Sequence, residues 1–267
     1  MEKHFEDYFP PGTEEHGLLL KVDLDRLPRH IAVIMDGNGR WAQQRGLPRV
    51  RGHKAGSASV REIVEASAQL GVGFLTLYAF SSENWKRPRY EVGSLWRLLR
   101  EHLGQELSLL VENDIRLKVI GRRAGIPAAV LKEIGRVEAL TRDNRRMTLV
   151  VALNYGGRDE IVDAARRIMV EGRIPADCLD EKGFAAHLST AGMPDPDLLI
   201  RTSGEMRLSN FLLWQIAYTE IFVTPVLWPD FRRRHLLEAI LEFQGRDRRF
   251  GDVRAAAKRP AEGHKRA

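Results

Sequence analysis

The sequence predicts a single α/β domain with a central, mostly parallel six-stranded sheet flanked by helices. Short apolar segments alternate along the chain with longer amphipathic stretches. The apolar segments are nearly continuous, as in strands that are covered on both faces of a sheet. No internal repeat and no long linker divides the 267 residues, of which 43% are hydrophobic and 29% charged, so one continuous core is expected.

Six segments rich in β-branched and aromatic residues are predicted to be strands. In chain order they are HIAVIM (30–35), FLTLYAF (74–80), IRLKVI (115–120), MTLVVAL (147–153), DLLI (197–200) and TEIFV (219–223).

The stretches between these segments have the periodicity of helices. The clearest covers residues 91–113, where apolar side chains recur at spacings of three and four: Val92, Leu95, Trp96, Leu99, Leu103, Leu107, Leu110 and Val111. Further helices are expected over about residues 56–70, 127–142, 158–171 and 232–243.

The positive charge of the chain is concentrated at its end. Residues 245–267 contain eight Lys or Arg and three Asp or Glu, which is +5 of the net charge of +6. We therefore divide the chain into an N-terminal tail (1–25), a domain (26–251) and a basic C-terminal tail (252–267). The nearly neutral body does not favour nucleic-acid binding over a broad basic face. The tail is interpreted as a solvated end, with attraction to an anionic membrane surface as the alternative.

Cysteine usage and hydropathy predict a cytoplasmic protein. Cys178, the one cysteine, has no partner within the chain, and this excludes an internal disulfide scaffold and a thiolate zinc site. No apolar run approaches the ~18 residues of a membrane span, and acids and prolines occupy the place of a signal sequence. Any membrane contact is expected to be peripheral.

Polar motifs follow four of the predicted strands. MDGNGRWA, FSSENWKRP, LNYGGR and RTSGEMRLSN each begin where a strand ends. Because the carboxyl ends of parallel strands share one edge of the sheet, these motifs are expected to converge on one crevice. Arginine presents a permanently charged fork that suits phosphate oxygens, and the glycines Gly37 and Gly39 allow backbone N–H groups to approach phosphate. The sequence thus predicts an anion pocket with these cations: Arg40, Arg49, Arg51, Arg87, Arg201 and Arg207.

Each motif also has a simpler interpretation. GNGRWA matches the loose dinucleotide fingerprint, but the acid expected about twenty residues later is absent, and no P-loop occurs. A plain turn explains the glycines of DGNG, although it does not require Asp36 and Arg40 beside them. His53 is explained equally well as a helix cap, and Trp41 and Trp85 as core aromatics.

Taken together, the motifs resemble those of the cis-prenyltransferases, most closely the bacterial undecaprenyl diphosphate synthases. The resemblance covers about residues 28–251, through MDGNGRWA, GHKAG, LTLYAFSSENWKRP, LNYGGR, DLLIRTSGEMRLSNFLLWQIAYTEIFVTPVLWPDF and RRFG. It implies a homodimeric enzyme that uses Mg²⁺ to add isopentenyl diphosphate units, with cis double bonds, to an allylic diphosphate such as farnesyl diphosphate. A lipid carrier of the undecaprenyl type, used in cell-wall synthesis, is the implied product.

The resemblance also implies roles for individual residues. Asp36 corresponds to the catalytic carboxylate and Mg²⁺ ligand, Asn84 to the residue assigned to proton removal, and Glu220 to a second metal carboxylate that reaches the site from the dimer partner. The implied substrate-binding residues are Gly37, Asn38, Gly39, Arg40, Trp41, Arg49, His53, Ser81, Ser82, Glu83, Trp85, Arg87, Arg201, Arg207 and Ser209. Arg249, Phe250 and Gly251 resemble a segment that completes the neighbouring site in some relatives.

One residue departs from the family pattern. Met206 stands where many bacterial members have a histidine that is sometimes credited with metal contact. A thioether is a poor ligand for Mg²⁺, so we expect Asp36 and Glu220, with substrate phosphates and water, to be sufficient.

The product of such a reaction is a hydrocarbon chain that must be shielded from water at about 0.8 kcal/mol per buried CH₂ group. The apolar face of the 91–113 helix and the 74–80 strand are candidates for a tunnel, with an ordinary core as the alternative. Two other functions are considered. The intact DGNGRW and SSENW motifs disfavour a non-catalytic subunit of the same fold, and the missing P-loop and the nearly neutral body disfavour a nucleotide- or nucleic-acid-binding module.

Overall fold

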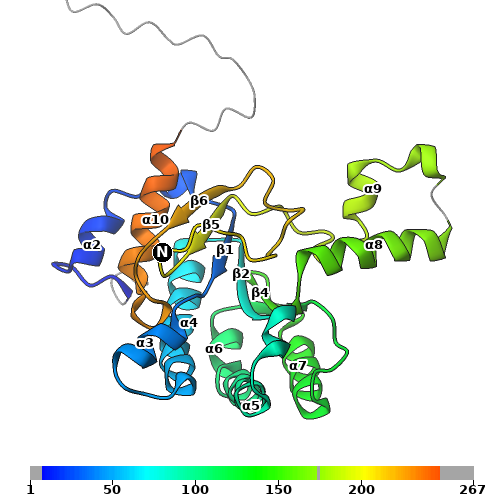
Figure 1. Ribbon diagram of the computed structural model, residues 1–267. Helices are drawn as coiled ribbons and strands as arrows, with labels where there is room; N and C mark the ends of the chain where they lie inside the picture. Colours follow the sequence, from blue (N-terminus) through cyan, green and yellow to red (C-terminus); the bar gives the residue numbers. More distant parts are fainter. Residues whose placement is uncertain (1–7, 173–174, 247–267) are drawn as a thin grey trace, which may run out of the picture.

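A six-stranded parallel sheet runs through the middle of the molecule (Figure 1). The computed structural model describes residues 8–172 and 175–246. The strands are β1 (His30–Ile34), β2 (Phe74–Ser81), β3 (Ile115–Ile120), β4 (Met147–Tyr155), β5 (Leu198–Arg201) and β6 (Glu220–Val223). They lie in the order β3-β4-β2-β1-β5-β6, and every paired neighbour is parallel. The predicted fold class is confirmed.

Strand β1 is the point at which the order of the sheet divides. It pairs with β2 on one side, where His30 lies opposite Phe74, and with β5 on the other, where Ile31 lies opposite Leu198. The connection from β1 runs to β2 on one side, whereas β5 on the other side is reached from β4. In open α/β sheets such a division opens a crevice beyond the carboxyl ends of the strands. Asp36 lies just beyond the end of β1, at that crevice.

Helices lie between the first five strands, whereas the segment from β5 to β6 contains none. The helices of the described residues are α2 (Glu14–Leu19), α3 (Asn38–Gln44), α4 (Arg49–Leu70), α5 (Arg89–Gln105), α6 (Leu107–Glu112), α7 (Ala128–Thr141), α8 (Gly157–Glu171), α9 (Glu181–Ala185) and α10 (Arg233–Gly245). Short 3₁₀ turns are η1 (Leu24–Arg26), η2 (Ser82–Lys86), η3 (Ala176–Cys178) and η4 (Trp228–Asp230). Figure 1 shows α8 and α9 projecting to one side of the sheet.

Two predicted helices differ from the observed ones. The helix expected over 91–113 is interrupted at Glu106, between α5 and α6. The apolar spacing continues across this single residue, so periodicity alone does not reveal the break. The helix expected from residue 56 already begins at Arg49. Pro48 caps it, at a helix start where a missing N–H costs little.

Alternate residues of the strands enter two separate cores. Ile31 and Val33 of β1 belong to the larger core, together with side chains of α4, α5, α7 and α10. Ala32 and Ile34 face the smaller core, which includes Phe211, Leu212 and Ile216 of the segment after β5. The period-2 alternation of a strand accounts for this division.

Part of the segment set apart as an N-terminal tail packs onto the domain. Phe9 is fully buried, and Gln244 of α10 binds the backbone N–H and C=O of Asp23 at 3.1 and 2.7 Å. Figure 1 shows α2 close to α10. The C-terminal tail 252–267 and the triplet Arg249, Phe250 and Gly251 lie outside the described residues. In the described part of the chain, no helix combines the length and the apolar character needed to cross a bilayer.

His30 makes the stability of the sheet depend on pH. Burial lowers the pKa of His30 from 6.5 to about 4, against the opposing effects of the Pro194 carbonyl and Asp197. The ring bonds Pro194 O and Thr76 Oγ1, each at 2.7 Å. Between these pKa values the unfolded chain binds the proton and the folded protein does not. Stability is therefore lost as the pH falls from about 6.5 towards 4.

We predict that His30 contributes about 2 kcal/mol to the loss of stability between pH 7 and pH 5. The measurement is urea unfolding of the parent and of His30→Gln at both pH values. The variant should be less stable at pH 7 but should lose less stability on acidification. An equal loss in both proteins would contradict the assignment.

Candidate active site

The structure brings the predicted motifs together at the carboxyl edge of the sheet. Asp36 follows β1, the turn η2 follows β2, and the segment 202–210 follows β5. Hydrogen bonds join these segments directly: Arg201 reaches Asp36, and Asn210 Nδ2 donates to Glu83 Oε1 at 2.9 Å. The predicted convergence is therefore observed.

The centre of the site is a cluster of one carboxylate and two guanidinium groups. Arg201 Nη2 donates to Asp36 Oδ2 at 3.0 Å, and Arg40 Nη2 lies 3.3 Å from the same oxygen. The Gly37 amide donates to Asp36 Oδ1 at 2.7 Å. Burial raises the pKa of the Asp36 carboxyl, but these hydrogen bonds and positive charges outweigh that effect and hold the pKa below its usual value. Asp36 is therefore ionised at neutral pH. Its side chain is 32% exposed to solvent, so a ligand can reach it.

The segment after β5 is shaped around Arg201, whose side chain is only 4% exposed. Arg201 Nη1 donates to Ser209 Oγ at 2.9 Å and to the Arg207 carbonyl oxygen. Ser203 and Ser209 have left-handed backbone, with φ of 74° and 48°. Such conformations are uncommon for residues other than glycine and often occur at functional sites.

Glu205 lies between two other arginines of the site. Its carboxylate is 3.2 Å from Arg40 Nη1 and 2.5 Å from Arg207 Nη1. The Arg207 side chain is exposed beside it. Met206 is 88% exposed, so it is not part of this cluster's packing.

The glycine-rich segment after Asp36 is held by close packing of α3 on α4. Gly37 has φ of 106°, as the turn interpretation expects. Gly39 is helical instead, and a Cβ there would lie 2.9 Å from the Arg49 guanidinium carbon. A Cβ on Gly52 would lie 1.9 Å from the Asn38 carbonyl oxygen, so only glycine allows these helices to approach so closely. Trp41 is turned towards Asp230, to which its Nε1 donates at 2.8 Å.

A second acid gathers arginines at the start of α5. The buried Glu91 carboxylate lies 3.0 Å from Arg87 Nη1 and 3.4 Å from Arg49 Nε. Nearby, burial together with the charges of Arg87 and Arg49 lowers the pKa of His53 to about 4, although Glu91 opposes this effect. His53 is therefore neutral at pH 7.

The serine-rich motif forms the turn η2. Asn84 Oδ1 accepts from the Ser81 amide at 3.1 Å, which fixes the turn, and Ser82 and Glu83 follow on it. Trp85 is 40% exposed, and its Nε1 donates to Asn154 Oδ1 at 2.7 Å. Trp85 is therefore not a buried core aromatic, which was the alternative interpretation, although its ring packs against Phe80 and Trp96.

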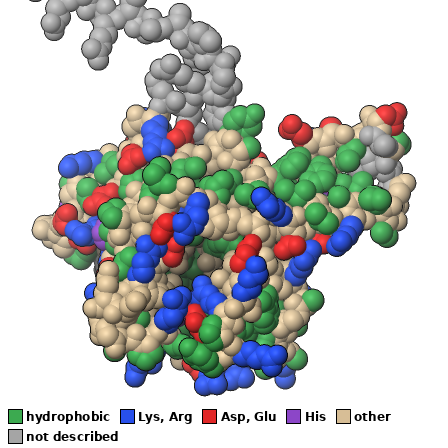
Figure 2. Space-filling view, in the orientation of Figure 1, with side chains coloured by type: hydrophobic (Ala, Val, Ile, Leu, Met, Phe, Trp, Pro, Cys, Tyr) green, Lys and Arg blue, Asp and Glu red, His purple; other side chains and the backbone are tan. Residues whose placement is uncertain are grey.

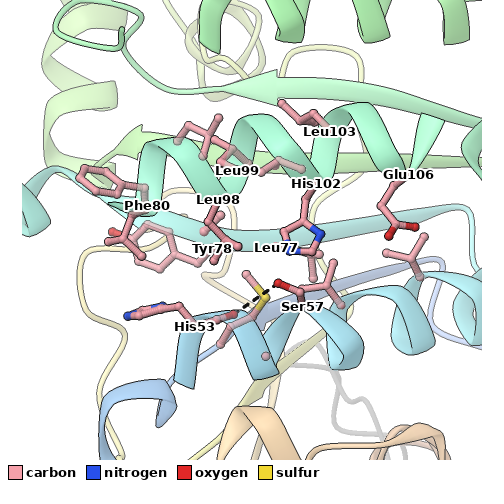
Figure 3. Close-up of a pocket in the computed structure, with 18 of the residues that line it drawn as sticks. His53, Ser57, Leu77, Tyr78, Phe80, Leu98, Leu99, His102, Leu103 and Glu106 are labelled. Carbon is pink, nitrogen blue, oxygen red and sulfur yellow. Dashed lines mark hydrogen bonds between the residues drawn. The ribbon is translucent and has the colours of Figure 1, made fainter. Parts of the chain in front are cut away.

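An apolar cavity of about 260 Å³ lies beside the turn η2, between α4, α5 and the sheet. Figure 3 shows His53 and Phe80 towards one end of it and Leu103 and Glu106 towards the other. The end at His53, called here its polar end, also includes Asn38, Asn84 and Arg87, and the charged or polar side chains of Arg61, His102 and Glu106 line the cavity as well. Two buried polar atoms there, Asn38 Oδ1 and His53 Nε2, have no hydrogen-bond partner among the described residues. Such atoms point to a ligand. The space-filling view is hollowed near its centre, with hydrophobic side chains inside and charged ones around (Figure 2).

Glu220 is not brought to Asp36 within one chain. It lies at the start of β6, opposite Leu198, which itself lies beside Ile31. From Ile31, β1 continues for three residues to Ile34, which is about 10 Å along the strand, and Asp36 lies two residues beyond that end. Glu220 Oε2 instead accepts from Arg246 Nη1 at 2.7 Å.

Sequence reasoning missed several residues of the site. Glu91 lies inside a predicted amphipathic helix, where an acid is ordinary, and only its burial beside two arginines marks it. Glu205 lies in the motif RTSGEMRLSN and Asn154 in LNYGGR. No spacing rule identifies the side chains to which they bind. The described residues contain no group of three or more His, Cys, Asp or Glu arranged to hold a metal ion.

The arrangement is suited to an anionic head group with an apolar tail. Its arginines are held by fewer acids, which leaves positive charge for phosphate oxygens. The adjacent cavity presents apolar side chains to a hydrocarbon.

Comparison with known proteins gives consistent matches over most of the chain. A family model described as "Putative undecaprenyl diphosphate synthase" matches residues 34–251. The isoprenyl transferase of Heliobacterium mobile is 53% identical over 246 residues, which cover 91% of this chain and 95% of that protein.

Two solved structures are similar in fold. Lavandulyl diphosphate synthase from Lavandula x intermedia, in complex with dimethylallyl diphosphate, has a TM-score of 0.83 and 39% identity, covering 85% of this chain and 100% of that one. A probable undecaprenyl diphosphate synthase from Campylobacter jejuni has a TM-score of 0.71 and 33% identity. The match covers 84% of this chain and 99% of that one.

The packing of α3 on α4 is tested by Gly52→Ala. We expect a loss of about 1–3 kcal/mol in unfolding free energy, because the added methyl group must displace the Asn38 backbone. Gly93→Ala is the matched control, since a Cβ there meets no atom within 4 Å. It should stabilise α5 by up to ~1 kcal/mol. The stabilities of both variants and of the parent are compared by thermal unfolding. Equal stability of Gly52→Ala and the parent would contradict the close contact between Gly52 and Asn38.

Proposed function

The chain belongs to the undecaprenyl diphosphate synthase family and is an isoprenyl transferase, and from this membership we propose its substrates and product. It adds isopentenyl diphosphate units in cis to an allylic diphosphate primer such as farnesyl diphosphate. The product is a polyprenyl diphosphate of the undecaprenyl type, a lipid carrier for cell-wall synthesis. This makes it a di-trans,poly-cis polyprenyl diphosphate synthase, a cis-prenyltransferase.

The observation that carries this proposal is the apolar cavity, whose lining includes Met35 and Asn38, together with the cluster of Asp36, Arg40 and Arg201 that begins between these two residues in the chain. A polyprenyl diphosphate has the same two parts, a charged head and a long hydrocarbon. Burying the hydrocarbon gains about 0.8 kcal/mol per CH₂ group. The bound dimethylallyl diphosphate of the lavender enzyme is itself an allylic diphosphate, in a protein of similar fold.

In the proposed reaction the allylic C–O bond breaks, a C–C bond forms to isopentenyl diphosphate, and the isopentenyl group loses a proton. The departing diphosphate takes the electron pair of the broken bond. Arginine and backbone N–H donors fixed in advance stabilise this developing charge more than the ground state. Asn84, at the polar end of the cavity, is proposed to lie at the departing proton.

The two substrates divide the site between them. We assign Gly37, Asn38, Gly39, Arg40, Trp41, Arg49 and His53 to the allylic diphosphate, and Arg201, Arg207 and Ser209 to isopentenyl diphosphate. Ser81, Ser82, Glu83, Trp85 and Arg87 form the wall between them.

The residues present fit a Mg²⁺ ion. Asp36 offers an ionised, partly exposed oxygen donor, and Mg²⁺ is usually held by one or two carboxylates together with substrate phosphates and water. When bound, the ion would neutralise charge on the leaving diphosphate. The exposed thioether of Met206 contributes no suitable ligand.

The position of Glu220 supports a shared site in a homodimer. Glu220 lies at the amino edge of the sheet, far from Asp36 of the same chain. We therefore propose that the Glu220 carboxylate serves the metal of a second copy. A cytoplasmic location with peripheral membrane contact suits a lipid product, and the basic tail is the proposed point of contact.

Asp36→Asn tests the catalytic assignment. Asn keeps the shape of the side chain but loses the charge that holds Mg²⁺, so kcat should fall by about 10² to 10³. The variant should still fold, but its free energy of unfolding should be lower by about 1–3 kcal/mol, because Arg201 loses its charged partner.

The measurement is steady-state turnover of farnesyl and isopentenyl diphosphates at saturating Mg²⁺, with product chromatography and thermal unfolding. Asp114→Asn is the control, because Asp114 accepts from the Arg145 and Arg146 amides at the opposite edge of the sheet. It should lose stability without losing turnover. If Asp36→Asn elongates the primer within about threefold of the parent rate, the mechanism is wrong.

A mixed dimer tests the role of Glu220. Asp36→Asn and Glu220→Gln chains, each inactive alone, are expressed together with different tags, and the mixed dimer is isolated. One of its two sites then keeps both carboxylates, so about half the parent rate should return. A mixed dimer as inactive as its parents would show that Glu220 does not act across an interface.

A further inference from the structure

Asn154 has an unusual place in the sheet. It lies in β4 with φ of 46°, in the left-handed region. The pairing of β2 with β4 passes over it, because Phe80 lies opposite Leu153 and Ser81 opposite Tyr155. Asn154 is only 8% exposed. A buried left-handed residue in a strand costs conformational free energy, which its other contacts must offset.

The Asn154 amide forms three hydrogen bonds. Nδ2 donates to the carbonyl oxygens of Arg122 and Ala124, both at 3.0 Å, and Oδ1 accepts from Trp85 Nε1 at 2.7 Å. Both ends of the amide are used. A carboxylate would repel the two carbonyls, and an apolar side chain would satisfy none of the three groups. Asn154 thus joins the loop after β3 to the turn η2.

The buried part of Trp85 is also held by packing. Its ring centroid is 5.3 Å from that of Phe80 and 5.6 Å from that of Trp96. Both of these aromatics line the cavity. The bare backbone of Gly125 faces the Trp85 ring, since a Cβ on Gly125 would lie 3.5 Å from it. The bond to Asn154 fixes the one polar atom of the indole, and so selects a single orientation of the ring.

We propose that Asn154 is a positioning residue for the turn η2, acting through Trp85. Trp85 directly follows Asn84, whose side chain caps the Ser81 amide. Fixing the indole therefore fixes the turn that carries Ser82 and Glu83 and presents Asn84 at the polar end of the cavity. The kinetic part of this inference rests on the proposed function, whereas the ordering of the turn does not.

Asn144 provides a matched control. Its Nδ2 also donates to two backbone carbonyls, those of Leu110 at 3.1 Å and Ile115 at 2.8 Å. It lies just before β4, at the amino edge of the sheet, far from η2 along the strands. Asn144→Ala removes the same kind of bond and should cost similar stability, but it leaves Trp85 untouched.

Hydrogen exchange tests the ordering without any activity. In Asn154→Ala, the amides of residues 81–87 should exchange about tenfold faster than in the parent, because the turn opens more often. Asn144→Ala should leave their exchange unchanged. If Asn154→Ala does not fold, Trp85→Phe removes the indole N–H, together with the five-membered ring that carries it, and should still speed exchange in 81–87. Unchanged exchange in the folded variants overturns the proposal.

Kinetics test the link to the reaction. Asn154→Ala should lower kcat/KM with farnesyl and isopentenyl diphosphates by about 10- to 100-fold, since small misplacements at a reacting centre are costly. Asn144→Ala should keep the parent value. In a Trp85→Phe background the Asn154→Ala effect should shrink at least about threefold, because the two changes remove the same bond.

Full additivity of the two changes, or equal losses in Asn154→Ala and Asn144→Ala, overturns the positioning role. A parent chain that forms no polyprenyl product refutes the proposed function instead, and hydrogen exchange then still decides whether Asn154 orders the turn.

Discussion

The ion pair between the buried Arg201 guanidinium and the Asp36 carboxylate is the interaction on which the site depends. A guanidinium stays charged at any physiological pH, so Arg201 at 4% exposure requires a negative partner and further acceptors. Asp36 supplies the charge, and Ser209 with the Arg207 carbonyl supplies the acceptors. The bonds of its two Nη atoms therefore join the ends of β1 and β5 and shape the segment that follows β5.

The same principle recurs around the site, because its acids organise its arginines. Asp36 holds Arg40 and Arg201, while Glu91 holds Arg49 and Arg87. Glu205 forms ion pairs with Arg207 and with Arg40, which is also paired with Asp36. These cations are thus fixed before a substrate arrives, and they outnumber the acids that fix them. A diphosphate then meets a preorganised positive field, which is the arrangement that favours developing charge in a transition state.

Much of this site could be predicted because its geometry follows from one topological rule. Parallel strands end at a common edge, so motifs after β1, β2 and β5 must meet there. The rule requires only that the strands be recognised, and their apolar composition was sufficient for that. The partners of each side chain were not predictable in the same way. Nothing in the sequence near Glu91 indicates that it is buried between Arg49 and Arg87, and nothing near Asn154 indicates its bond to Trp85.

The sequence by itself determined the class of fold, the six strands, the edge at which the motifs converge, and the family that those motifs resemble. These properties depend on local composition and periodicity, which a single chain segment carries. Only the tertiary structure decided that α4 begins at Arg49, that the helix after η2 is interrupted at Glu106, and that Glu220 lies away from Asp36. These features depend on close approach between segments distant in sequence. Gly52 matters only because Asn38 packs against it, and Arg201 can be buried only because Asp36 lies beside it. The position of Glu220 likewise depends on how β6 pairs with β5.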